Sequence, residues 1–238
     1  MINPDEMHSR NNAVMAFNKE IGLRPDEEIL IKKFFPTPPV WILDLGCGNG
    51  RTTVSLNDMG YKVIGVDISE PLIRSAKQIN PSGNYLVGDV RSLSFRPEQF
   101  DAVLFSWNGL DYIYPQEKRK NVINDIWTVL KPGGIFFYSS HNMFGVWTRI
   151  WKPIWLTLNA LRFMKDQIPI RRYLLEWYCV WRDEALGRPI FYSAPPKVQM
   201  KLLQRTKWTV LAVRSVRHPL IAPKMLTDVH VNYICKKM

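Results

Sequence analysis

A glycine-rich turn directly after a short apolar segment is the feature that most constrains this sequence. Residues 40–45 are typical of a short buried strand, and Gly46, Gly48 and Gly50 follow it at alternating positions. Glycines in this arrangement let the backbone turn sharply and approach a ligand, and the N–H groups at the start of the next helix point toward that ligand. The turn therefore predicts a ligand site between the first strand and a helix that begins at Arg51.

The residue at position 51 argues against one class of ligand. A dinucleotide-binding motif would have its third glycine there, but this chain has Arg51, which disfavours a nicotinamide or flavin cofactor. In an open parallel sheet, ligands bind at the carboxyl ends of the strands, which here carry Asp44, Asp67, Asp89 and Ser106. A carboxylate after the second strand, such as Asp67, can accept the hydroxyls of a ribose.

Strand and helix patterns alternate through the first half of the chain. Further strands are predicted at residues 61–66, 85–87, 101–105 and 135–138, and helices after Gly50, after Ser69 and from 116 to 130. Continuous apolar strands separated by helices indicate an α/β fold, with a parallel sheet covered on both faces. Asp101 opens its strand at the opposite edge of the sheet from the predicted site, so we expect it to have a structural role.

Four motifs in order resemble those of the class I S-adenosylmethionine-dependent methyltransferases. They are the segment 42–50, Asp67 at the end of the second strand, Asp89 after the third strand, and the turn at 130–134. The resemblance covers about residues 40–142 and, more loosely, 194–238. It implies a Rossmann-like, doubly wound, mostly parallel seven-stranded sheet with an antiparallel last strand, to which this chain adds a helical, aromatic-rich insertion after the fifth strand.

This resemblance implies S-adenosyl-L-methionine as the cofactor. The glycine turn would lie against its methionine part and ribose, Asp67 would hold the ribose hydroxyls, and Asp89 with the Val90 amide would meet the adenine. Ser106 and Trp107 would border the methyl group. The expected cofactor-binding residues are Asp44, Gly46, Cys47, Gly48, Asn49, Gly50, Asp67, Ile68, Asp89, Val90, Ser106 and Trp107. Cys47 is expected to pack between glycines rather than to react.

The acceptor site is less defined by the sequence. Methyl transfer from a sulfonium mainly needs alignment of the reactants, whereas a hydroxyl acceptor also needs a base, worth about 10²–10⁴ in rate. His141, just past the fifth strand, is the best placed base, although a histidine bonded to loop backbone is the alternative. Asn108 and Asp111, after the fourth strand, are candidates for orienting the acceptor. The other histidines, His8, His218 and His230, are less well placed.

The basic charge of the chain is concentrated in its C-terminal part. The whole chain has 32 Lys and Arg against 21 Asp and Glu, and residues 143–238 hold 17 against five. This asymmetry indicates an anionic partner, which would be a phosphorylated substrate, a nucleic acid or an acidic membrane surface. A solvated basic face that aids solubility is the plainer interpretation.

Residues 143–190 match no pattern of the family and hold five of the nine tryptophans. Trp147, Trp151 and Trp155 recur at helical spacing among basic residues, although Pro153 splits the run. The segment would serve as a substrate lid, as core packing over the sheet, or as a peripheral contact with an anionic membrane through 143–165. Acceptor specificity is expected to reside here.

We therefore predict one methyltransferase domain over 1–238, with a helical cap (1–39), a cofactor-binding core (40–142), an insertion or lid (143–190) and the rest of the sheet (191–238). It would methylate an oxygen or nitrogen of a small, anionic or amphipathic acceptor. An RNA methyltransferase is less favoured, because the Asn/Asp-Pro-Pro-Tyr/Phe signature is missing after the fourth strand. A non-catalytic cofactor-binding subunit is the third interpretation.

The cellular compartment is predicted from cysteine usage and from what the sequence lacks. The three cysteines, Cys47, Cys179 and Cys235, are widely spaced, with no Cys-x-x-Cys motif, which favours a reducing compartment and no metal or disulfide framework. No signal-like segment opens the chain and no apolar stretch reaches about 18 residues. We expect a cytoplasmic protein, in one interpretation peripheral to the membrane.

Overall fold

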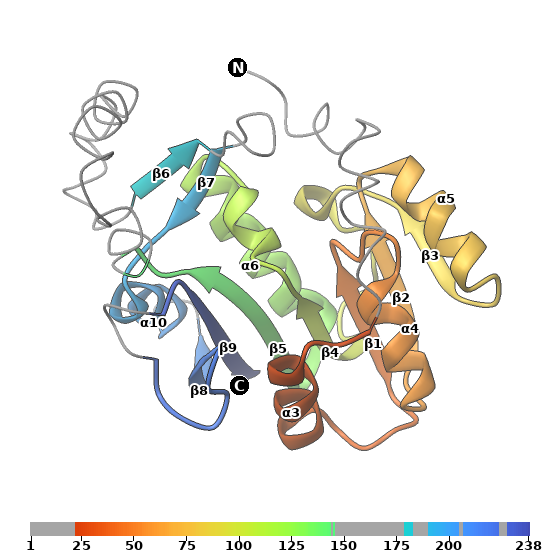
Figure 1. The fold of residues 1–238 in the computed structure, drawn as a ribbon, viewed down its shortest axis with the longest axis horizontal. Coiled ribbons are helices and arrows are strands. Elements are labelled where there is room, and N and C mark those ends of the chain that lie inside the picture. Colours follow the sequence, from red (N-terminus) through yellow and green to blue (C-terminus); the bar gives the residue numbers. More distant parts are fainter. Residues whose placement is uncertain (1–21, 144, 146–178, 183–189, 205–206, 224–227) are drawn as a thin grey trace.

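The computed structural model describes residues 22–143, 145, 179–182, 190–204, 207–223 and 228–238 (Figure 1). The first half contains α3 (Pro25–Phe34), β1 (Trp41–Leu45), α4 (Arg51–Asp58), β2 (Lys62–Asp67), α5 (Glu70–Ile79), β3 (Asn84–Val87), the 3-10 helix η1 (Val90–Ser92), β4 (Phe100–Phe105), the 3-10 helix η2 (Gly109–Tyr112), α6 (Gln116–Val129) and β5 (Leu130–His141). The second half contains β6 (Cys179–Arg182), β7 (Ile190–Ser193), α10 (Pro196–Gln204), β8 (Trp208–Ser215) and β9 (His230–Lys237).

Seven of these strands form the predicted sheet. Strands β3, β2, β1, β4 and β5 lie side by side in that order and are all parallel. Strand β9 is antiparallel to β5, and β8 is antiparallel to β9. The prediction of a Rossmann-like, mostly parallel sheet with an antiparallel last strand is confirmed. Because the strand order reverses between β1 and β4, a crevice for a ligand is expected at their carboxyl ends.

A short hairpin extends the sheet beyond this prediction. Strand β7 joins β5 where Ser193 pairs with His141, and β6 is antiparallel to β7. Strand β6 lies within the insertion that was expected to be helical, so residues 179–182 correct that expectation. Their sequence, Cys-Val-Trp-Arg, contains the β-branched and aromatic residue types that favour strands. Of the rest of the insertion, only Met143, Gly145 and Ile190 are among the described residues. The part of the predicted cap before residue 22, which includes His8, also lies outside them.

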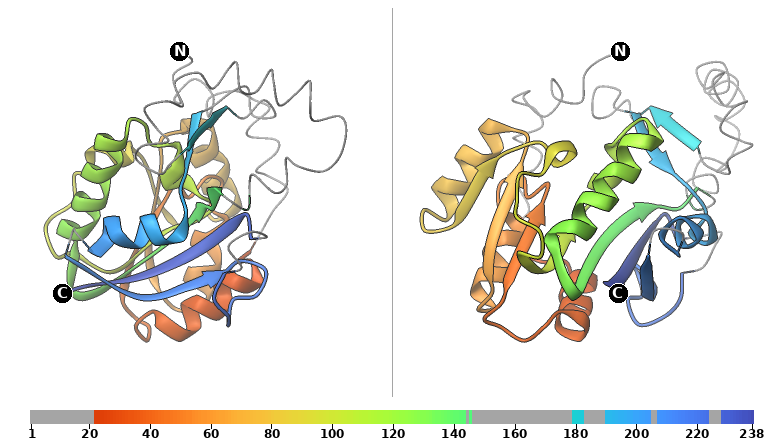
Figure 2. Two further views of the ribbon diagram at one scale, coloured as in Figure 1. Left: turned by 90° about the vertical axis from the view of Figure 1, so that its left-hand side faces the viewer. Right: turned by 180° about the vertical axis from the view of Figure 1, so that it is seen from behind.

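Helices cover both faces of the sheet (Figure 2). On one face, Val122 and Ile126 of α6 and Leu203 of α10 pack in one apolar cluster with β1, β4, β5 and β9. On the other face, Leu30 of α3 and Leu56 of α4 pack in a second cluster.

Local sequence signals place two of the elements. Ser69 caps α5 as predicted, since its Oγ accepts a hydrogen bond from the Leu72 N–H at 3.4 Å. The predicted turn at residues 131–134 lies instead within β5, where the pairing with β4 shifts its register between Phe100 and Ala102. Asp101 is structural as expected, because it accepts hydrogen bonds from Trp41 N–H and Lys131 Nζ at 2.9 and 2.8 Å.

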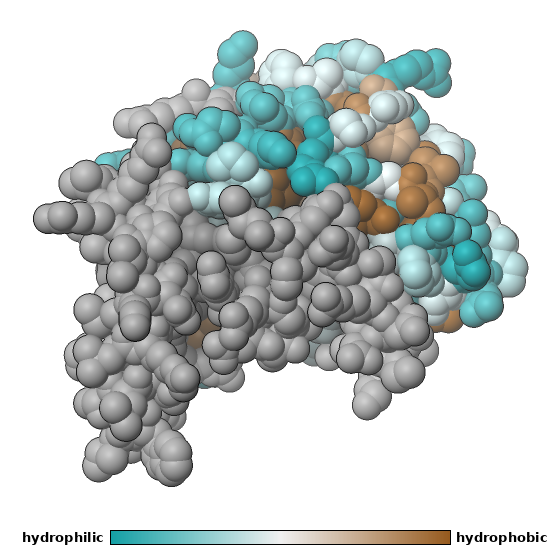
Figure 3. Space-filling view, turned by 90° about the horizontal axis from the view of Figure 1, so that it is seen from above, coloured by the Kyte–Doolittle hydropathy of each residue, from teal (hydrophilic) through white to brown (hydrophobic). Residues whose placement is uncertain are grey.

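The described surface combines hydrophilic side chains with a hydrophobic group on the side where α5 and β3 lie (Figure 3). Ile79 of α5 and Leu86 and Val87 of β3 are 43%, 47% and 55% exposed. Ile79 is exposed because it is the last residue of α5 and lies past the turns that bury Leu72, Ile73 and Ala76. Within the described ranges, no helix combines the length and the apolar character that a membrane span requires.

Candidate functional site

A pocket of about 530 Å³ opens at the carboxyl ends of the parallel strands. It is lined by ten of the residues expected to bind the cofactor, namely Gly46, Cys47, Gly48, Asn49, Asp67, Ile68, Asp89, Val90, Ser106 and Trp107. The expected acceptor residues Asn108 and His141 also line it, whereas Asp44, Gly50 and Asp111 do not. A volume of this size is typical of a small-molecule site.

The glycine turn has the backbone conformation that its sequence requires. Gly46, Gly48 and Gly50 have φ angles of 63°, 57° and 86°, in the left-handed region that disfavours side chains. A Cβ on Gly50 would also lie only 2.7 Å from the Tyr85 Oη. Gly50 therefore serves the turn through its conformation and the space that it leaves, without lining the pocket itself.

Asp67 at the end of β2 is held by two backbone amides. Its Oδ2 accepts the Gly48 N–H at 2.9 Å and its Oδ1 accepts the Ser69 N–H at 2.8 Å. Each carboxylate oxygen has lone-pair capacity for a second hydrogen bond. The side chain is 8% exposed and lines the pocket. Asp67 is thus fixed in one orientation and is suited to accept the two hydroxyls of a ribose.

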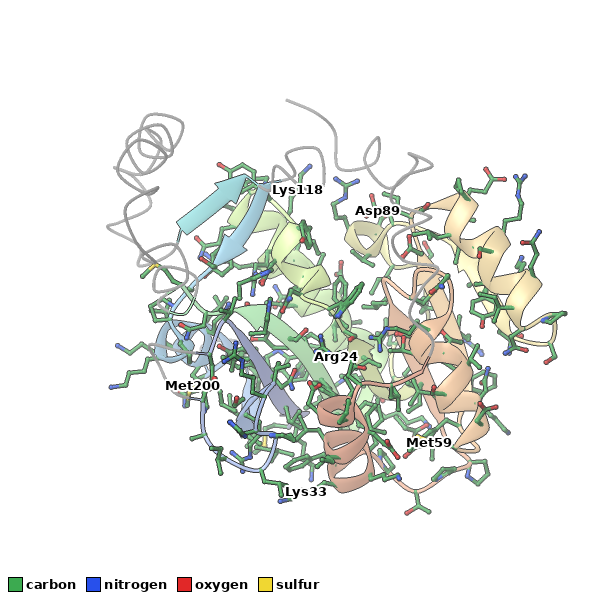
Figure 4. All side chains as sticks on the ribbon, in the orientation of Figure 1. Arg24, Lys33, Met59, Asp89, Lys118 and Met200 are labelled. Carbon is green, nitrogen blue, oxygen red and sulfur yellow. The ribbon has the colours of Figure 1, made fainter. Side chains whose placement is uncertain are left out.

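Asp89 lies after β3 and lines the pocket, as does Arg24, and both are labelled in Figure 4. It accepts the Arg91 N–H at 2.8 Å and forms an ion pair with the Arg91 guanidinium. Partial burial opposes ionisation, but the hydrogen bonds and charge of Arg91 outweigh it and lower the pKa of Asp89. The carboxylate expected beside the adenine is therefore already shared with an arginine.

Asp44 and Cys47 are both buried beside the turn. Asp44 Oδ2 accepts hydrogen bonds from Thr52 Oγ1 and Thr53 Oγ1, each at 2.6 Å. Burial raises the pKa of Asp44 to about 6, although the two threonines partly offset it. Burial also raises the pKa of the Cys47 thiol, which packs with Tyr85 in an apolar cluster. Asp44 thus joins β1 to the start of α4, and its carboxylate does not reach the pocket.

Arg51 joins the turn to the N-terminal helix α3. Its guanidinium donates to both carboxylate oxygens of Glu27, at 2.7 and 2.9 Å, and to Ser106 Oγ at 3.1 Å. Ser106 Oγ in turn donates to Glu27. Burial opposes ionisation of Glu27, but its bonds with Arg51 outweigh burial and lower its pKa. The sequence predicted Ser106 at the site but not this partner, because Glu27 is distant in the chain.

Asp111 and His141 form a second buried constellation. Asp111 is fully buried, and its Oδ2 accepts both the His141 N–H at 2.6 Å and the His141 Nδ1–H at 2.9 Å. Its Oδ1 accepts from Arg119 and Ser140 Oγ, each at 2.7 Å. Burial opposes ionisation, but the His141 hydrogen bond and the Arg119 charge outweigh it and lower the pKa of Asp111. Asp111 does not line the pocket itself, but its hydrogen bonds fix the orientation of His141, which does.

The buried network continues from Asp111 into two helices. Arg119 of α6 is fully buried and donates to Gln199 Oε1 of α10 at 3.0 Å, and Gln199 Nε2 donates to Ser140 Oγ at 2.8 Å. The Arg119 guanidinium also lies over the Tyr192 ring, 4.1 Å from its centroid. These contacts fix the carboxylate that holds His141. The residues that make them come from four separate elements, α6, α10, β5 and β7, so no local pattern indicated them.

The residues after β4 have a strained backbone at the pocket. Trp107 and Asn108 have φ angles of 51° and 58°, which cost non-glycine residues about 1–3 kcal/mol each. The Asn108 N–H donates to Ser139 Oγ at 2.8 Å, and Asn108 Nδ2 lies 3.0 Å from His230 Nδ1. His230, which the sequence placed less well, also lines the pocket. The sequence predicted an antiparallel last strand but not its pairing with β5, which brings His230 to the pocket.

The comparisons with known proteins agree with this geometry. Residues 42–134 match a family model described as a methyltransferase domain. Residues 42–134 thus belong to a methyltransferase domain family, and the motifs and fold around them are similar to those of the class I S-adenosylmethionine-dependent methyltransferases. The motifs of the matched region, including the glycine turn and Asp67, lie around the described pocket. The cofactor of the family is S-adenosylmethionine.

Similar proteins act on different kinds of acceptor. A malonyl-[acyl-carrier protein] O-methyltransferase of Pseudescherichia vulneris is 23% identical over 68% of this chain and 61% of its own length. A tRNA (carboxymethyluridine(34)-5-O)-methyltransferase of Saccharomyces cerevisiae is 36% identical over 44% of this chain and 37% of its own length. This chain spans between 38% and 61% of the length of four such curated relatives.

A solved structure extends the likeness in fold to nearly the whole chain. The 1,6-didemethyltoxoflavin-N1-methyltransferase of Burkholderia thailandensis, bound to 1,6-didemethyltoxoflavin and S-adenosylhomocysteine, has a TM-score of 0.66. The match covers 98% of this chain and 86% of that one at 17% identity. This likeness shows the fold, and the acceptor of the present chain has to be argued from its own residues.

Proposed function

We propose that this protein transfers a methyl group from S-adenosylmethionine to an oxygen or nitrogen of a small, anionic or amphipathic acceptor. The observation that carries the proposal is that one pocket contains both the Asp67 carboxylate with its glycine turn and the His141 imidazole held by Asp111. Asp67 and the glycine turn suit the cofactor, and His141 held by Asp111 suits the removal of a proton from an acceptor.

The residues around the turn fit the cofactor. Asp67 would accept the ribose hydroxyls, the glycine turn would allow close approach of the methionine part, and the Val90 amide would meet the adenine. Asp44 and Gly50 would act indirectly, by shaping the turn that Gly46 and Gly48 present. When bound, the cofactor supplies an electrophilic methyl group on a positively charged sulfur.

His141 is suited to be a general base. Because Asp111 is ionised, it only accepts hydrogen bonds, so the Nδ1 of His141 carries the hydrogen and Nε2 is the nitrogen that takes up a proton. His141 Nε2 would take the proton of the acceptor oxygen as that oxygen bonds to the methyl carbon, which the cofactor would supply while its sulfur keeps the electron pair of the broken carbon–sulfur bond. Asn108 would orient the acceptor, and Trp107 and Ser106 would border the methyl group.

The choice of a small acceptor rests on the pocket. A malonyl-[acyl-carrier protein] O-methyltransferase among the relatives is compatible with an oxygen acceptor. The tRNA relative and the 17 basic residues after Met143 support RNA as the second candidate. We favour the small acceptor because the His141 site lies within a pocket of about 530 Å³.

The test is the release of S-adenosylhomocysteine with panels of anionic small molecules, lipid-linked acceptors and RNA. His141→Ala is expected to lower turnover at least about 100-fold, as the loss of a general base does, and to leave the Kd for S-adenosylhomocysteine within about twofold. His218→Ala is the matched control, because His218 is exposed and does not line the pocket.

Three results would contradict parts of this proposal. Retained turnover in His141→Ala excludes the base. Turnover with RNA alone replaces the small acceptor by RNA. Cofactor binding without turnover on any panel would leave the third interpretation, a non-catalytic cofactor-binding subunit.

A further inference from the structure

Two histidines lie opposite each other at the acceptor end of the pocket. His141 ends β5 and His230 begins β9, and the two residues are directly paired in the antiparallel register. Their ring centroids are 4.9 Å apart with the planes inclined by 57°, and both side chains line the pocket. An acceptor that reaches His141 therefore also meets His230.

The two imidazoles have different hydrogen-bonding partners. His141 Nδ1 lies 2.9 Å from Asp111 Oδ2, and His230 Nδ1 lies 3.0 Å from Asn108 Nδ2. A carboxylate only accepts hydrogen bonds, whereas an amide nitrogen only donates them. His141 Nδ1 must therefore donate, and His230 Nδ1 must accept. In the neutral state the hydrogen of His230 is then on Nε2, whereas the Nε2 of His141 has none.

The partners of both rings are themselves fixed. Asp111 is fully buried and bound by Arg119, and Asn108 is 7% exposed with its backbone N–H bonded to Ser139 Oγ at 2.8 Å. The buried Asn108 Oδ1 has no hydrogen-bond partner among the described residues.

We propose that His141 and His230 bind the acceptor as a pair, with His141 Nε2 accepting a hydrogen bond and His230 Nε2–H donating one. The substrate class that fits is an acceptor with two adjacent heteroatoms. One carries the proton that His141 removes and becomes methylated, and the other is an oxygen that accepts from His230. Vicinal diphenols and hydroxyl groups next to a carbonyl have this pattern. The inference rests on the proposed function and deepens it.

The first experiment reads the two tautomers directly. The ¹⁵N imidazole resonances of the full-length chain, saturated with S-adenosylhomocysteine, are recorded near pH 8.5, about two units above the ordinary histidine pKa. We expect His141 in the Nδ1–H form and His230 in the Nε2–H form, assigned with His141→Gln and His230→Gln. The same tautomer at both positions would overturn the inference.

The second experiment uses catechol and phenol as probes under anaerobic conditions, with the protein saturated with S-adenosylhomocysteine. Catechol has two vicinal hydroxyls and phenol has one, and we expect catechol to bind at least about tenfold more tightly. His230→Phe keeps an aromatic ring but no donor, and should reduce this preference below about threefold. His230→Gln restores a donor and should recover part of it, and His218→Phe should change nothing.

The outcomes separate this inference from the proposed function. Equal binding of catechol and phenol to the wild-type protein, or an undiminished preference in His230→Phe, would overturn the inference alone. Absence of S-adenosylhomocysteine binding in the wild-type protein would overturn the proposed function on which it rests.

Discussion

Arg51 and Glu27 form a buried ion pair with two hydrogen bonds, of 2.7 and 2.9 Å, that joins the helix after the glycine turn to α3. Their side chains are 8% and 1% exposed. Arg51 occupies the position at which a dinucleotide-binding motif has its third glycine. Arg51, whose presence disfavours a dinucleotide, thus has a structural role, because it fixes α3 beside the pocket and donates a hydrogen bond to Ser106.

Glu27→Gln is expected to destabilise the fold strongly. The substitution leaves the buried Arg51 guanidinium without its counter-charge, which costs about 3–5 kcal/mol. Glu28→Gln is the matched control, because Glu28 pairs with Lys32 on the surface, where such pairs contribute about 0–1 kcal/mol. Urea unfolding of the two variants measures the difference. Equal free energies of unfolding would show that the Arg51 pair does not stabilise α3.

The pH dependence of stability should show the buried state of Asp44. Its pKa is raised in the folded protein from 3.8 to about 6, so its contribution to stability is present below pH 3.8 and is lost as the pH rises through 6. Glu27 acts in the opposite direction. Because its pKa is lowered in the folded protein, its contribution to stability is present above its ordinary pKa of 4.5 and is lost as the pH falls.

Asp44→Asn removes the first of these titrations. The free energy of unfolding of this variant, relative to wild type, should rise on the order of 3 kcal/mol between pH 4 and pH 7, as a shift of about two pKa units implies. Urea unfolding at several pH values gives the difference between the two proteins, in which the contributions of groups that do not interact with Asp44 cancel. A difference that does not vary with pH would contradict the raised pKa.

Asp67→Ala is expected to weaken binding of S-adenosylmethionine at least about tenfold, equivalent to about 1.4 kcal/mol. The physical reason is the loss of both oxygens that would accept the ribose hydroxyls. Asp67→Asn keeps one oxygen and should fall between the alanine variant and the wild type, and the exposed Asp58→Ala should bind normally. Isothermal titration calorimetry measures all four proteins. A dissociation constant unchanged in Asp67→Ala would rule out the ribose assignment.

Much of the fold could be predicted from the sequence because its signals are local. The apolar strands, the glycine turn and the Ser69 cap each depend on neighbouring residues, and the structure has them at the expected places. The β6–β7 hairpin was not predicted, because it joins the sheet through a single pairing of Ser193 with the distant His141.

The candidate site was predictable in its outline but not in its connections. The turn and the strand ends placed most of the pocket residues, since parallel strands bring their carboxyl ends to one edge. The sequence could not show that Asp44 and Asp111 point away from the pocket, because burial is decided by packing between elements. His230 enters the site from a strand 89 residues after His141, through a register that no motif specifies.

The central claim is tested most directly by calorimetric titration of the protein with S-adenosylhomocysteine and S-adenosylmethionine after nuclease and high-salt treatment. The ratio of absorbance at 260 and 280 nm checks that nucleic acid is absent. We predict binding of both ligands with micromolar dissociation constants at one site. The absence of binding by the nucleic-acid-free protein would contradict the assignment of this pocket to the cofactor.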